Sequence, residues 1–199
     1  FFVDADADNN AYITGQTSGD YPVTAGVYEN PGSSQFVTKL NPELSSIIYS
    51  TVFGSGTSTV NISPTALLVD DCENVYVAGW GGTTNTGFNP ATGTVTGMPT
   101  TDDTFSSTTT GSDFYFIVFK KNLSGLIYAT FFGSPAAADH VDGGTSRFDK
   151  AGRIYQAVCA GCGGFDDFPT TDGAWSEVNA STNCNLGVIK YEFDFEGPE

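Results

Sequence analysis

The stretches that decide the fold are three copies of one pattern: DADNNAYITG (Asp6 to Gly15), DDCENVYVAG (Asp70 to Gly79) and DKAGRIYQAV (Asp149 to Val158). In each copy an Asp is followed six positions later by a Tyr within an apolar run. The column three positions after the Asp holds Asn9, Glu73 and Gly152. Asn and Gly suit tight turns, and Asp accepts backbone N–H bonds there, although Glu fits the column poorly. The pattern predicts an Asp turn followed by a strand whose Tyr packs between neighbouring sheets.

The rest of each copy also repeats. A Pro-centred segment follows, as YPVTAGVY, MPTTDDTF and FPTTDGAW, with an aromatic residue six positions after the Pro. These aromatic residues are Tyr28, Phe105 and Trp175. An apolar strand then ends in a lysine, and we expect Lys39, Lys120 and Lys190 to be in register. A last strand, IIYSTVFG or LIYATFFG, closes the first two repeats but has no counterpart in the third.

Each repeat therefore holds about four strands, which predicts an all-β chain of antiparallel sheets arranged as β-propeller blades. The repeats cover approximately residues 1–56, 57–135 and 136–199, with 194–199 as the beginning of an exit linker. Propellers typically close with about four to eight blades. We therefore expect these three repeats to be a segment of a larger propeller.

The charge of the chain narrows its partners. Its 23 acidic and 7 basic residues give a formal net charge of −16. Binding of nucleic acid or of an anionic membrane surface depends on Lys and Arg, so we predict neither. No apolar run approaches the length of a membrane span, so we also predict no membrane insertion. The acidic charge instead suits long, solvated loops such as Thr83 to Thr110.

The columns D-x-x-x-N-x-Y-V-x-G, F-P-T-T-x-G-A-W, F-V-x-K and Y-x-T-x-F-G are similar to the β-propeller repeats called SBBP. Longer stretches, such as SPTALLVDDCENVYVAGWGG and the rare word CAGCGG, resemble a region of large cell-surface proteins of the Bacteroidetes. In those proteins, PKD-type immunoglobulin-like domains and a gliding-motility-associated C-terminal sorting domain follow. The resemblance covers nearly the whole chain. It implies export by type IX secretion, an extracellular location, and a role in adhesion or surface structure beside other domains of the same protein.

The four cysteines are Cys72, Cys159, Cys162 and Cys184. In an exported protein an even number favours disulfides, here by three alternative pairings. Our working hypothesis joins Cys72 to Cys159, tying adjacent repeats, and Cys162 to Cys184, closing a long loop. The C-x-x-C spacing of CAGC also suits zinc, so a site of four thiolates stays open as the alternative.

We expect no cofactor, but Asp4, Asp6 and Asp8 raise the question of calcium. An EF-hand loop beginning at Asp4 needs Gly at its sixth position and Glu at its twelfth, where this chain has Asn9 and Gly15. A looser Ca²⁺ site remains open. In the repeat pattern only Asp6 belongs to the turn column.

We expect a non-catalytic structural or adhesive module. A carbohydrate-binding module is the alternative, with Trp80 of GWGG as the exposed ring and Trp175 as a packing anchor; glycans or other surface proteins would be its partners. A polysaccharide-degrading enzyme ranks third. The acids it would use, Asp102/Asp103 and Asp166/Asp167, lie in equivalent loops, where solvated carboxylates are the ordinary finding. The single histidine, His140, lacks a nucleophile elbow nearby.

Overall fold

The computed structural model of the chain describes residues 1–82, 93–141 and 146–193. Within these ranges the regular elements are β-strands and one short 3-10 turn, η1 (Lys121–Leu123), and no helix there has the length and hydropathy needed to cross a membrane. The strands are β1 (Phe2–Ala5), β2 (Ala11–Gln16), β3 (Gln35–Leu40), β4 (Ile47–Phe53), β5 (Ser63–Val69), β6 (Val75–Trp80), β7 (Phe114–Phe119), β8 (Leu126–Phe132), β9 (Ser146–Phe148), β10 (Ile154–Ala160) and β11 (Asn185–Tyr191).

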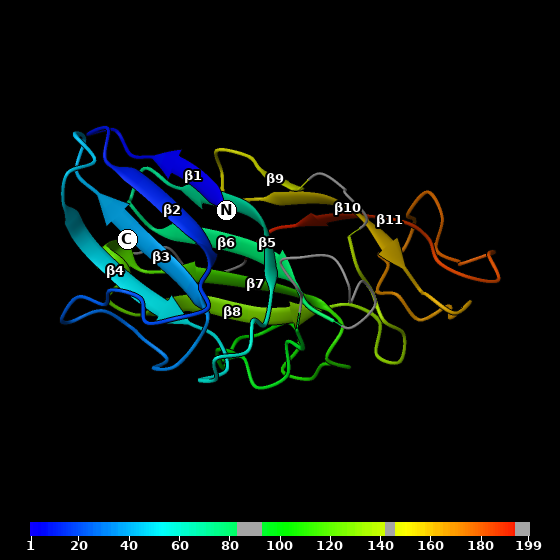
Figure 1. Ribbon diagram of the computed structural model, residues 1–199. Helices are drawn as coiled ribbons and strands as arrows, with labels where there is room; N and C mark the ends of the chain where they lie inside the picture. The colour runs from blue at the N-terminus through cyan, green and yellow to red at the C-terminus, as the bar shows by residue number, and fades with distance from the viewer. Residues whose placement is uncertain (83–92, 142–145, 194–199) are drawn as a thin grey trace.

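The strands form three antiparallel sheets in chain order (Figure 1). The first sheet is β1-β2-β3-β4, the second is β5-β6-β7-β8, and the third is β9-β10-β11. Each is a meander in which every strand pairs with the next one along the chain. The predicted all-β class is confirmed, and the third sheet has three described strands because the closing strand of the other repeats has no sequence counterpart. The predicted linker at 194–199 and residues 83–92 of the long loop lie outside the described residues.

The Asp turns are built alike in all three sheets. The Oδ1 atom of Asp6 accepts the N–H groups two and four residues later, at 3.0 and 2.9 Å. Asp70 and Asp149 repeat these two bonds at 2.8–3.0 Å. In each turn the hydroxyl of the Tyr six positions after the Asp donates to Oδ2 of that Asp, at 3.1–3.3 Å. The predicted turn chemistry is confirmed.

The column that holds Asn9, Glu73 and Gly152 has φ values of 63°, 63° and 80°. This left-handed conformation is easy for Gly and Asn and costs a residue such as Glu about 1 kcal/mol or more. Glu73 keeps its place because its carboxylate accepts hydrogen bonds from Lys39 of the first sheet, at 2.9 Å, and from Lys121 of its own repeat. The residue that fits the turn poorly therefore links two sheets.

Apolar cores on both sides of the second sheet hold the sheets face to face. The first lies between sheets one and two and includes Val37, Phe53, Ile117 and Phe119. The second lies between sheets two and three and includes Phe114, Phe116, Ile154 and Ile189. The first strands of the sheets also adjoin, since β1 contacts β5 and β5 contacts β9. The three repeats thus pack in sequence, each against the next.

The predicted lysine register is wrong in the second repeat. Tyr12 pairs with Lys39 and Tyr155 with Lys190, but Tyr76 pairs with Val118. Lys120 lies two residues beyond that position and outside the strand. The second repeat therefore has no lysine where Lys39 and Lys190 stand.

Candidate functional site

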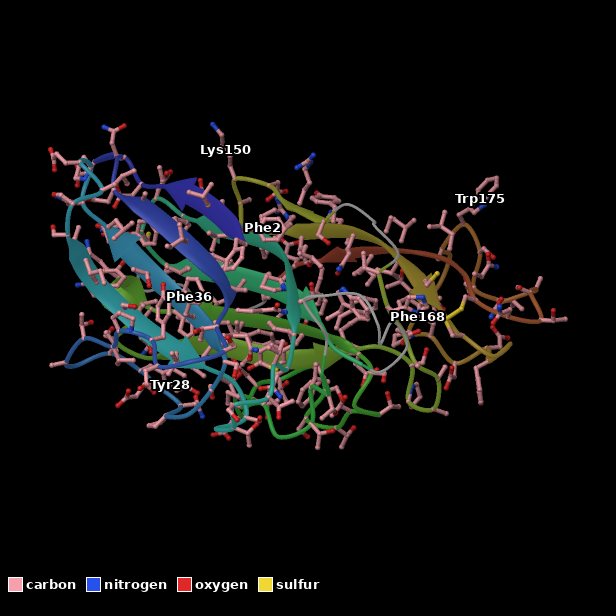
Figure 2. All side chains as sticks on the ribbon, in the orientation of Figure 1. Phe2, Tyr28, Phe36, Lys150, Phe168 and Trp175 are labelled. Carbon is pink, nitrogen blue, oxygen red and sulfur yellow. A yellow bond between two sulfur atoms is a disulfide. The ribbon has the colours of Figure 1, made fainter. Side chains whose placement is uncertain are left out.

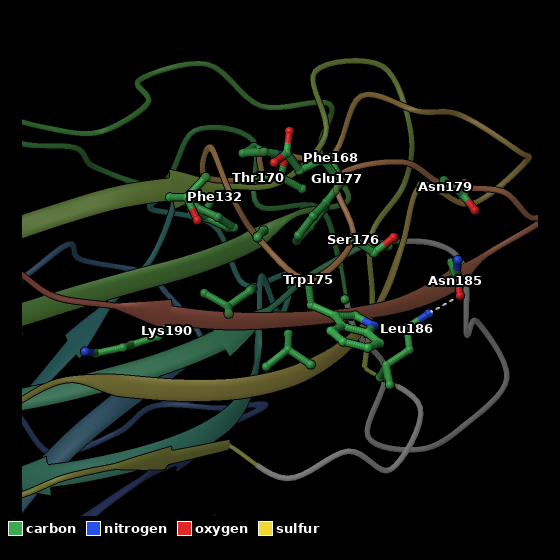
Figure 3. A pocket seen from close by; sticks show the side chains of 18 of the residues that line it. Phe132, Phe168, Thr170, Trp175, Ser176, Glu177, Asn179, Asn185, Leu186 and Lys190 are labelled. Carbon is green, nitrogen blue, oxygen red and sulfur yellow. Dashed lines mark hydrogen bonds between the residues drawn. The ribbon is translucent and has the colours of Figure 1, made fainter.

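A groove with a volume of about 720 Å³ lies along β11, the edge strand of the third sheet, and is lined both by outward residues such as Val188 and by residues of the core between the second and third sheets. Its walls come from β11, from the loop between β10 and β11, and from aromatic residues of the second repeat. Of the lining residues labelled in Figure 3, Trp175 and Leu186 are exposed and Phe132 is buried. Polar groups from Glu177, Asn179 and Asn185 also line it.

The third sheet has an outward face, which carries Val188, and the equivalent face is covered in the other two sheets. In the third strand of each sheet, one residue pairs with the Tyr of the repeat. The residue two positions before it is Val37 in the first sheet, Phe116 in the second and Val188 in the third. Val37 and Phe116 are fully buried, whereas Val188 is 76% exposed. The equivalent residues of the first two sheets are buried because the next sheet packs over them. The third sheet has the same apolar face without a described neighbour.

The Tyr of the repeat pattern is likewise buried in the first two sheets and exposed in the third. Tyr12 is 0% exposed, Tyr76 5% and Tyr155 42%. The predicted packing of this Tyr between sheets is therefore confirmed for the first two repeats. In the third repeat the ring of Tyr155 borders the exposed face of the sheet. Within the described residues its hydroxyl donates to Asp149 at 3.3 Å.

The aromatic residue of the Pro segment reaches forward to the next repeat. The Tyr28 N–H donates to the carbonyl of Leu123 at 2.7 Å, and its ring lies 6.0 Å from that of Phe119. Phe105 lies 6.1 Å, centroid to centroid, from Tyr191 of the third repeat. Trp175 is fully exposed and projects from the end of the molecule (Figure 2). The prediction that it anchors packing is wrong within the described residues, where no side chain covers its ring.

Trp80 is not an exposed ligand platform, so that prediction is also wrong. It is the last residue of β6, 6% exposed, and it belongs to the core between the second and third sheets. Its ring lies 6.0 Å from the ring of His140. A sugar cannot reach a ring covered in this way. Trp175 is the exposed tryptophan.

The cysteines divide differently from the working hypothesis. The Cys162–Cys184 disulfide is present, as predicted. The Cys72–Cys159 pairing is wrong: no bond joins them, and Cys72 is exposed. Cys72 lies in the turn before β6, whereas Cys159 lies near the far end of β10. Cys159 lies five residues after Ile154, the first residue of β10, which is roughly 17 Å along the strand.

Sequence reasoning did not predict that His140 lies beside Cys159 and Cys162. The backbones of His140 and Cys159 exchange two hydrogen bonds, at 3.1 and 2.8 Å. Nδ1 of His140 lies 3.5 Å from Sγ of Cys162. The signal in the sequence was present, since CAGC and the lone histidine are both unusual, but their spacing along the chain does not show that they meet.

Asp4, Asp6 and Asp8 take part in different contacts. Asp4 accepts the Val69 N–H at 2.8 Å, and Asp6 binds its own turn and Lys39. Asp8 is exposed and only its N–H bonds to Asp6. Among the described residues, the potential ligands that gather in a group of three or more are His140, Cys159 and Cys184. The structure therefore does not bring the three aspartates together as one calcium cage.

Two buried carboxyl groups meet at the end of β8. A side chain at Gly133 would strike both Asp113 and Asp139. Burial raises the pKa of each carboxyl, and Oδ1 of Asp113 has no hydrogen-bond partner. At the corresponding Gly54 of the first repeat, the two groups are the neutral amides of Gln35 and Asn61. The acid pair therefore carries an electrostatic cost that the first repeat avoids.

The sequence matches no protein-family model, and no curated protein is similar to it.

Proposed function

We propose that this chain is a non-catalytic scaffold segment of an exported, cell-surface β-propeller, and that the outward face of its third sheet packs against a further repeat of the same kind. The observation that carries the proposal is the series Val37, Phe116 and Val188, in which the same position is buried twice and exposed once. Neighbouring exposed apolar side chains on one face of a sheet favour an interaction surface.

The arrangement of the sheets supports the propeller. Each repeat is a meander, neighbouring repeats stack face to face, and the first strands β1, β5 and β9 adjoin in order. Blades around a common axis have these three properties. The location at the cell surface rests on the resemblance of the repeat columns. The Cys162–Cys184 disulfide is in keeping with an oxidising compartment.

Sedimentation over a range of chain concentrations tests the face. When the chain is studied alone, only a second copy can cover the exposed face of the third sheet, so we expect reversible association. We also expect the uncovered face to bind an apolar dye. Val188→Asp should abolish both while leaving the thermal midpoint of unfolding unchanged. Leu44→Asp, which alters an exposed apolar residue in the turn between β3 and β4, is the matched control and should associate like the unaltered chain. A chain that stays monomeric and binds no dye contradicts the proposal.

A second candidate is carbohydrate binding at the same groove. The fully exposed Trp175 offers a stacking platform, and Glu177, Asn179 and Asn185 supply hydrogen-bonding groups beside it. Titration with oligosaccharides separates the two functions. Saturable quenching of Trp175 by a sugar that is kept in Val188→Asp, together with a calorimetric binding signal that is lost in Trp175→Ala, favours the lectin. The absence of quenching at any sugar concentration, together with association that depends on Val188, favours the scaffold.

A further inference from the structure

Three cysteines and the only histidine of the chain meet at one end of the third sheet. Cys159 and Cys162 lie at the end of β10 and in the turn after it, Cys184 immediately precedes β11, and His140 comes from the segment before β9. The ligand atoms of His140, Cys159 and Cys184 all lie within 4.8 Å of one another. Cys162 is bonded to Cys184 and lies 3.5 Å from Nδ1 of His140. Three ligand atoms that zinc prefers therefore lie together, and Sγ of Cys162 is in contact with two of these residues.

The distances suit a tetrahedral ion. With Zn–S bonds of about 2.3 Å and Zn–N bonds of about 2.0 Å, a sulfur and a nitrogen ligand lie about 3.5 Å apart, and two sulfurs about 3.8 Å apart. The Cys162–His140 distance already has the first value. Opening the disulfide lets the sulfurs of Cys162 and Cys184 separate to the second. The spacings among His140, Cys159 and Cys184, all within 4.8 Å, need only side-chain rotation.

The surrounding structure holds the C-x-x-C turn in place. Gly161, between the two cysteines, has φ +62°, and a side chain there would strike the carbonyl of Phe165. Its N–H donates to the buried carboxyl of Asp139 at 3.0 Å, and its carbonyl accepts from Asn179 at 3.1 Å. His140 is itself buried, next to Trp80. Fixed and shielded ligands are the usual condition of a closed, structural metal site.

We propose that the reduced chain binds one Zn²⁺ ion through the thiolates of Cys159, Cys162 and Cys184 and Nδ1 of His140. A dithiol opens the Cys162–Cys184 bond by donating two electrons and two protons, and is itself oxidised to a disulfide. Zn²⁺ then displaces one proton from each of three thiols, while His140 binds as the neutral imidazole. All four positions are filled by the protein, so the ion is structural: it joins β10, β11 and the segment before β9 as the disulfide joins Cys162 to Cys184.

Co²⁺ titration of the whole chain, reduced under anaerobic conditions, tests the site. We expect one Co²⁺ per chain, with thiolate charge-transfer bands and the intense visible bands of tetrahedral cobalt, bleached by one equivalent of Zn²⁺. Cys159→Ser leaves the Cys162–Cys184 disulfide intact, so its folding is checked in the oxidised form before reduction. Cys159→Ser and His140→Ala should each weaken binding at least about tenfold. Cys72→Ser, at the exposed cysteine, should bind like the unaltered chain.

Alkylation supplies a second readout. In the zinc-loaded chain iodoacetamide should modify Cys72 alone, and after chelation all four cysteines, as counted by mass spectrometry. Reduced chain that binds no stoichiometric metal overturns the proposal. Binding that is undiminished by both Cys159→Ser and His140→Ala overturns it as well.

Discussion

Replacing Lys39 by Met tests the link between the first two sheets. Nζ of Lys39 lies 2.8 Å from Asp6 and 2.9 Å from Glu73, and it lies over the ring of Tyr12 at 4.9 Å from the centroid. The side chains of Lys39 and Asp6 are almost wholly buried. Met fills a similar volume without the charge, so the variant leaves two carboxylates facing each other with their shared cation gone.

The size of the loss follows from Asp6. Burial alone would raise the pKa of Asp6, but hydrogen bonds from Lys39 and Asn10 outweigh it and lower the pKa from 3.8 to about 2. A lowering of this size corresponds to about 2.5 kcal/mol of native-state preference for the carboxylate. Removing one partner of a buried pair commonly costs about 3–5 kcal/mol. Because Asn10 still bonds to Asp6, we expect about 3 kcal/mol at pH 7.

Urea unfolding between pH 7 and pH 3 measures this loss. A lowered pKa stabilises the native state above pH 4, and this stability is lost as the pH falls toward 2, so the gap between Lys39→Met and the unaltered chain should narrow in acid. Adding Asp6→Asn and Glu73→Gln to the variant should restore part of the loss at pH 7. Lys150→Met, at an exposed lysine (Figure 2), is the control and should change stability by less than about 0.5 kcal/mol. A loss below about 1 kcal/mol, or one independent of pH, refutes this account of the buried pair.

Three further predictions concern other parts of the fold. Asp113→Asn should stabilise the chain at pH 7, because burial raises the pKa of Asp113 and so penalises its charged form in the native state; the gain should disappear in acid, and a loss at pH 7 would contradict it. Asp70→Ala should lower the free energy of unfolding by about 2 kcal/mol and Asp149→Ala by clearly less, since the third turn is more exposed; equal losses would show that burial of the Tyr hydroxyl is irrelevant. Replacing both Cys162 and Cys184 by Ser, measured with a chelator present, should cost about 3 kcal/mol in thermal unfolding, because the bond closes a loop with a sequence separation of 22; an unchanged midpoint would contradict this.

The features that sequence predicted best are local. The bonds between Asp, turn and Tyr span six residues, and one turn geometry satisfies all of them wherever the pattern occurs. The lysine column failed because identity in the alignment does not fix register across a long loop: Val118, two residues before Lys120, occupies the position of Lys39. Strand register depends on pairing with the previous strand, which lies beyond the loop.

The site residues that were predicted wrongly depend on neighbours from other repeats. Trp175 occupies the position in the third repeat that Tyr28 occupies in the first. Whether the ring is buried depends on the following repeat, which supplies the contacts. Trp80 is covered by the third sheet, far along the chain. The meeting of His140 with Cys162 also needs the fold, because 22 residues separate them.

The most direct test of the central claim is the exposure of Trp175 in a chain whose other tryptophan is replaced, Trp80→Phe. Acrylamide quenching of this single ring, measured from low to high chain concentration, reports whether the open face of the third sheet is covered by another repeat. The account predicts full accessibility at low concentration and protection with a blue-shifted emission as copies associate, both prevented by Val188→Asp. A ring that stays equally accessible in associated copies would contradict the claim that this face is where a further repeat packs.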